Sequence, residues 1–120
     1  MDESILDSVK KIIGIDSSYT VFDPDLIIHI NTVFMILNQL GIGTEEVFSI
    51  SDNSTTWNEF IQGNSAIQSV KSYMALRVKM LFDKPQSGTL IDAYREDIKE
   101  LEWRMYIACD SQRIDREGSQ

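Results

Sequence analysis

The segment formed by residues 24–40 constrains the fold most, because its apolar side chains recur at helical spacing on more than one side. Asp23 precedes Pro24 in the pattern of an N-cap, and Gly41 follows the segment. Ile28 and Met35 form a second apolar stripe about 100° around the helix from the main face. That main face consists of Ile27, Ile30, Val33, Phe34, Leu37 and Leu40. A helix apolar on nearly all sides is usually buried, so we expect the second stripe to lie either in the domain core or in a subunit interface.

Three further segments show helical spacing of apolar residues, at about residues 4–13, 65–82 and 87–108. Gly14 ends the first of them, and Pro85 separates the last two. A chain of 120 residues fits one domain. The sequence therefore predicts an all-α fold, a small bundle of about four helices.

Residues 41–64, between the second and third predicted helices, are rich in Gly, Ser, Thr, Asn and Asp, which predicts a long loop. Ser54 or Thr55 could cap a short helical turn that carries Trp57 and Phe60. These aromatic side chains are too apolar to be left in water, and long loops of this kind are often functional.

The last residues, 110–120, are polar and end in Gly-Ser-Gln, which predicts a flexible C-terminal tail. We therefore divide the chain into a helical domain at 1–109 and a tail at 110–120.

The charge balance argues against several classes of partner. Nineteen acidic residues oppose eleven basic ones, giving a net charge of −8. Binding to the phosphate backbone or to an anionic membrane needs clustered Lys and Arg, so neither is expected. The first residues, MDESILDSVKK, lack the apolar core of a signal peptide, and no segment is apolar enough to cross a bilayer. Cys109 is the only cysteine, which excludes an intrachain disulfide and suits a reducing compartment.

Residues able to carry catalysis are scarce. His29 is the only histidine, and neither a nucleophile nor a well-placed carboxylate accompanies it. The GIGTEE string at 41–46 follows a helix rather than a strand, so it is not a phosphate-binding loop. The carboxylates at Glu96 and Glu100 are better explained as a solvated helix face than as metal ligands. We therefore expect no catalytic, cofactor or metal site, and an enzyme or metalloprotein using these carboxylates is the weakest alternative.

Two residues of the last two helices stand out. Arg77 projects into an apolar face, where an arginine needs an acidic partner. The short connection between the helices implies antiparallel packing, which would let Arg77 pair with Glu102. Trp103 points away from the apolar face of its helix. It either belongs to an interface, where tryptophan is enriched, or covers the loop between the second and third helices.

Four strings in order resemble the phage head-tail connector family, whose members include head-completion and neck adaptor proteins of siphophages and Gram-positive prophages. They are DPDLIIHINTVFMILNQLGIG, FSISDNSTTWNEFI, VKSYMALRVKMLFDKP and IKELEWRM, and the resemblance covers about residues 3–108. It implies a structural protein that forms a ring, commonly twelvefold, below the portal protein and extends the DNA channel. The implied partners are the portal, neighbouring subunits and a downstream stopper or tail protein. DNA would pass without specific binding, and the protein would reside in the virion neck after assembly from the host cytoplasm.

In that setting, residues from about Cys109 onward resemble a segment that reaches the portal, with Ile114 as its one apolar anchor. The residues we expect in subunit or partner contacts are Ile28, Met35, Trp57, Phe60, Arg77, Trp103, Cys109 and Ile114. The alternative is a small helical binding module that acts on one partner as a monomer or dimer.

Overall fold

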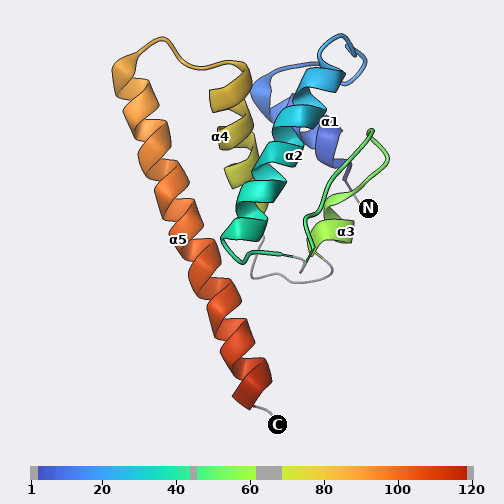
Figure 1. Ribbon diagram of the computed structural model, residues 1–120. Coiled ribbons are helices and arrows are strands. Elements are labelled where there is room, and N and C mark those ends of the chain that lie inside the picture. The colour runs from blue at the N-terminus through green and yellow to red at the C-terminus, as the bar shows by residue number, and fades with distance from the viewer. Residues whose placement is uncertain (1–2, 44–45, 62–68, 119–120) are drawn as a thin grey trace.

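The computed structural model describes residues 3–43, 46–61 and 69–118, with side chains as far as Ala108. The described residues form helices and no β-strands, which confirms the all-α prediction. The helices are α1 (Ile5–Ile13), α2 (Asp23–Gln39), α3 (Trp57–Ile61), α4 (Val70–Phe82) and α5 (Gly88–Gly118) (Figure 1).

Helix α4 is the centre of the bundle, because it packs against α1, α2 and α5 (Figure 1). Its side chains at Val70, Tyr73, Met74 and Val78 are fully buried. Helix α2, in contrast, buries only one side, which carries Leu26, Ile30, Val33, Phe34 and Leu37. The second apolar stripe of α2 therefore lies outside the domain core.

Helix α1 ends at Gly14 as the sequence predicted, and it begins one residue later than expected, after Ser4. The Ser4 hydroxyl accepts a hydrogen bond from the backbone N–H of Asp7 at 3.2 Å, which caps the first turn. Gly14 adopts a left-handed conformation and its N–H satisfies carbonyl groups of the last turn. At α2 the prediction was wrong in one respect: Phe22 occupies the N-cap position, and Asp23 is the first helical residue.

The long loop contains the short helix α3, as expected, but its cap is Thr56 rather than Ser54 or Thr55. The Thr56 N–H donates to the Glu59 carboxylate at 2.7 Å, the reciprocal half of a capping box. Backbone hydrogen bonds from Ile5 to Thr55 and from Trp57 to Glu3 tie this segment to α1. The loop is thus fixed against the bundle on the side opposite α5 (Figure 1).

Helix α5 is longer than predicted. We expected it to end near Ala108 and to be followed by an irregular tail from Asp110, whereas the helix continues to Gly118. Only Ile98 and Met105 of its described side chains are buried. The C-terminal part of α5 projects beyond the rest of the bundle (Figure 1).

Gly43 occupies a position that only glycine fits without strain. Its φ is +94°, and a Cβ atom there would collide with the ring of Phe60. Phe60 is held in a cluster with Phe34 and Phe48, with ring centroids 4.8 and 5.2 Å away. Neither the ring nor the backbone can therefore yield without disturbing the core.

We expect Gly43→Ala to lower the free energy of unfolding by about 2–4 kcal/mol, since left-handed strain and overpacking add. Gly14→Ala is the matched control, because Gly14 has a φ of +90° but open space around the missing Cβ. That control should cost only about 1–2 kcal/mol. Urea denaturation of both variants measures the difference, and equal losses would show that the Phe60 contact is unimportant.

Candidate functional site

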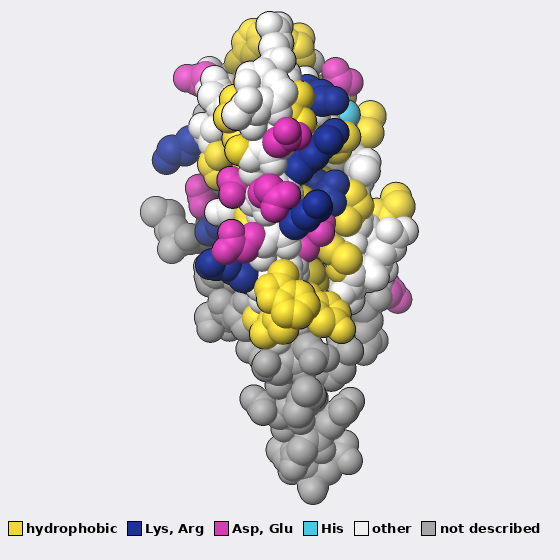
Figure 2. Space-filling model, turned by 90° about the vertical axis from the view of Figure 1, so that its left-hand side faces the viewer, with side chains coloured by type: hydrophobic (Ala, Val, Ile, Leu, Met, Phe, Trp, Pro, Cys, Tyr) yellow, Lys and Arg dark blue, Asp and Glu magenta, His cyan; other side chains and the backbone are white. Residues whose placement is uncertain are grey.

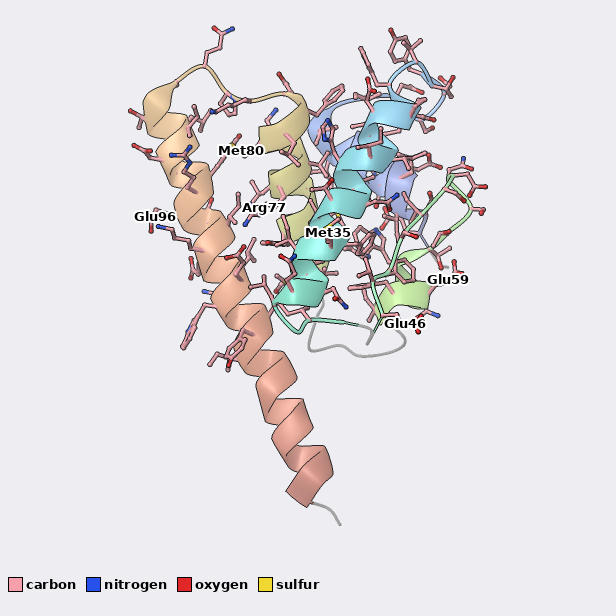
Figure 3. All side chains as sticks on the ribbon, viewed as in Figure 1. Met35, Glu46, Glu59, Arg77, Met80 and Glu96 are labelled. Carbon is pink, nitrogen blue, oxygen red and sulfur yellow. The ribbon has the colours of Figure 1, made fainter. Side chains whose placement is uncertain are left out.

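The junction between α4 and α5 is built on three polar side chains, and it confirms the predicted Arg77–Glu102 pair. Arg77 Nη2 lies 2.7 Å from Glu102 Oε2. Arg77 Nε also donates to the Tyr73 hydroxyl at 3.1 Å, and that hydroxyl donates to the same Glu102 oxygen at 2.6 Å. Figure 3 shows Arg77 pointing from α4 toward α5. The three groups thus join the two helices through charge-assisted hydrogen bonds.

The surroundings of this junction keep both Tyr73 and Arg77 protonated, the state in which each can donate hydrogen bonds. Burial, followed by the hydrogen bond to Glu102, raises the pKa of Tyr73, so the phenol stays protonated and can donate. Partial burial disfavours the charge on Arg77, but its hydrogen bonds to Glu102 and Tyr73 outweigh this and raise the pKa of Arg77. Arg77 is therefore an internal link between helices, with about a third of its side chain still exposed.

We expect Arg77→Met to lower the free energy of unfolding by about 1–2 kcal/mol, because Glu102 would keep its burial and lose its cation. The value lies below that for a fully buried pair because Arg77 and Glu102 are about a third and a quarter exposed. Arg104→Met is a matched control, since Arg104 pairs with Glu100 on the exposed side of α5. The control should change stability by less than about 0.5 kcal/mol. Chemical denaturation measures the free energy of unfolding of both variants. An Arg77→Met protein as stable as the wild type would contradict a stabilising role of the Arg77–Glu102 pair.

Among the exposed apolar side chains of the described residues, two groups include residues that we expected in subunit or partner contacts. The first, the α2 stripe, consists of Ile28 and Met35, which are 62% and 50% exposed. Met35 is labelled on α2 in Figure 3. Sequence analysis left open whether these residues enter the core or a subunit interface. Since the monomer does not bury them, the interface alternative is the one that we retain.

The second surface, the α5 patch, consists of Trp103, Tyr106 and Ile107, which are 62%, 49% and 43% exposed. The Trp103 and Tyr106 rings stack with centroids 6.4 Å apart. Figure 2 shows hydrophobic side chains gathered on α5, between a charged stretch and the grey C-terminal segment. Trp103 is therefore not buried against the described part of the loop between the second and third predicted helices, and its place in an interface stays a prediction.

Other candidate contact residues lie elsewhere. Trp57 and Phe60 are buried in the core of the single chain, where the Trp57 indole N–H donates to the Ser8 hydroxyl at 2.6 Å. Their burial explains why the loop is apolar and leaves them almost no surface for a subunit contact. Cys109 and Ile114 lie in α5, but their side chains are outside the described residues.

Lys10 is the important residue that sequence analysis missed. Its position in the last turn of α1 suits the helix dipole. That explanation gave no reason to expect a buried side chain. The side chain is fully buried, and its ammonium group donates to the carbonyls of Ser17 and Tyr19 at 3.1 and 2.7 Å. It also lies 2.8 Å from Asp23 Oδ1, an oxygen that has no other donor in the described chain. One cation thus fixes the loop between α1 and α2.

We expect Lys10→Met to lower the free energy of unfolding by about 2–4 kcal/mol, because two carbonyls and a carboxylate would lose their donor. Lys11→Met is the matched control, because Lys11 is exposed and forms no ion pair among the described residues. Thermal and urea denaturation should show almost no effect of that control. A Lys10→Met protein as stable as the wild type would contradict this account of the loop.

Groups suited to catalysis are not assembled in the described part of the chain. No three His, Cys, Asp or Glu side chains there come together in a way that could hold a metal ion. His29 lies beside the Phe82 ring, with centroids 6.4 Å apart. Across the same residues, no helix is both long and apolar enough to cross a membrane.

The described residues form an all-α fold with exposed apolar side chains on α2 and α5. The family model described as phage connector protein matches residues 5–112, nearly the whole chain. The chain therefore belongs to the phage connector family, as its sequence resemblance indicated. No curated protein and no solved structure matches it. Membership implies a structural role in the virion and contacts with other phage head or tail proteins.

Proposed function

We propose that this protein is a head-tail connector that forms a ring below the portal, extends the DNA channel and docks the next neck or tail protein. The family match over residues 5–112 carries the proposal. The α2 stripe and the α5 patch support it, because a ring subunit needs two different surfaces for its two neighbours. A module that binds one partner needs only one such surface.

The charge of the protein suits a channel through which DNA moves. With 19 acidic and 11 basic residues, the chain repels phosphate groups rather than holding them. We therefore propose that DNA passes the ring without specific binding. The same charge keeps separate copies soluble in the host cytoplasm before they assemble in the virion neck.

The projecting end of α5 is the segment that we assign to the portal. It begins near Cys109 and includes Ile114, and it leaves the bundle as a helix (Figure 1). A helix has its backbone hydrogen bonds already formed, so it loses less conformational entropy on binding than an irregular tail does. In this proposal the portal binds the end of α5, while the bundle forms the ring.

The test is assembly with the portal protein of the same phage. We expect light scattering and negative-stain imaging to show rings, or capture of this protein by the portal ring, as its concentration rises. A chain truncated after Ala108 should keep its folded bundle and lose portal capture. A protein that stays monomeric and ignores the portal would contradict the proposal and favour a small binding module. Failure of the truncated chain to fold would be recognised by circular dichroism, and Ile114→Asp then replaces the truncation.

A further inference from the structure

We propose that neighbouring copies of this chain meet through the α5 patch of one and the α2 stripe of the next. This inference rests on the proposed function, because it names the surfaces that close the ring. Trp103 would be the central side chain of the contact, and Met35 would receive it.

The outer side of α2 is suited to a second copy by its lack of charge. Residues 26–43 contain no Asp, Glu, Lys or Arg, although a quarter of the whole chain is charged. Each copy carries a net charge of −8, so two copies repel one another except where such a neutral face is presented. The one hydroxyl between Ile28 and Met35 is satisfied internally, since Thr32 Oγ1 donates to the Ile28 carbonyl at 2.9 Å. Covering this stripe therefore leaves no hydroxyl without a partner.

On each of the two surfaces, the outward residues are spaced along their helix in the way that helix-helix packing requires. On α2, the outward positions 28, 32, 35 and 39 follow the alternating steps of four and three residues that a helix-helix seam requires. On α5, positions 96, 99, 103 and 106 follow the same rule, with Trp103 and Tyr106 as its bulky members. Exposed Trp and Tyr side chains of this kind are enriched among residues that dominate binding energy.

The two surfaces lie on different helices of the same chain, so their pairing is heterologous and each contact leaves one free surface at either end. Helices α2 and α5 both run downward in Figure 1, inclined to one another. In the proposed contact, α5 of one copy lies on α2 of the next and runs in the same general direction.

This parallel arrangement also matches charges. With Trp103 on Met35, Ile107 lies level with Gln39, and Arg95 lies near the first turns of the neighbouring α2. Asp25 is exposed in those turns. Neither Arg95 nor Asp25 takes part in an ion pair within the described residues. The proposed contact would pair them at the rim of an apolar centre, which is the usual layout of a protein interface.

Disulfide crosslinking tests the pairing. In a Cys109→Ser background, which removes the one native cysteine, chains carrying either Gln39→Cys or Ile107→Cys keep Trp103 and Met35 in place. We expect mild oxidation of a 1:1 mixture under ring-forming conditions, or on the portal, to give covalent dimers, whereas neither chain alone does. Asn58→Cys mixed with Ile107→Cys is the control, because Asn58 is exposed on α3, away from the proposed contact.

The outcomes separate this inference from the proposed function. Crosslinks within a single chain type would show an isologous contact and overturn the inference. Rings or portal capture without any mixed crosslink would overturn it and leave the proposed function intact. Absence of rings, capture and crosslinks together would overturn both.

Complementation between charged variants gives a second test. Met35→Glu and Trp103→Glu each destroy one surface, and both positions are exposed, so the fold should be unaffected. We expect neither variant to form rings alone, because every junction would bury an unpaired charge. Mixed together, they should form dimers and stop there, since each pair retains one intact junction. Rings formed by either variant alone would contradict the inference.

Discussion

The contact between α4 and the middle of α5 determines where the exposed α5 patch of this protein lies. Helix α5 buries only Ile98 and Met105 among its described side chains, so apolar burial alone holds it weakly. The hydrogen bonds among Tyr73, Arg77 and Glu102 add direction to that contact, since they fix both the rotation and the height of α5. Once α5 is fixed in this way, Trp103 and its neighbours must face outward.

The sequence predicted those parts of the fold that depend on local patterns. Apolar periodicity, Gly14 and Gly41 located the helices, and the antiparallel relation of the last two led to the Arg77 pair. The sequence did not predict the burial of side chains that are covered by segments distant along the chain. Lys10 resembles an ordinary C-terminal lysine until the loop folds over it, and Trp57 resembles a contact residue until α1 covers it. Helical periodicity could not predict whether Met35 lies in the domain core or in a subunit interface, because both environments favour apolar side chains.

Stability and assembly make opposite demands on the apolar residues of α2. One side of the helix stabilises the monomer through Phe34 and Leu37, and the other side leaves Ile28 and Met35 in water. Such exposure favours association, and the acidic charge spread over the remaining surface limits it. Under the proposed function, this balance would keep free copies apart at low concentration and let them associate when a template raises their local concentration.

Helix α5 continues well beyond Met105, the last of its described side chains that is buried, so a small tilt of the helix moves its far end appreciably. From Met105 to Gly118 the helix continues for about 20 Å at 1.5 Å per residue. A tilt of about 10° at Met105 would therefore displace its far end by roughly 3 Å, while the bundle stays in place. In the proposed ring, the tips of these helices could then follow small differences in radius between stacked rings without any rearrangement of the bundles.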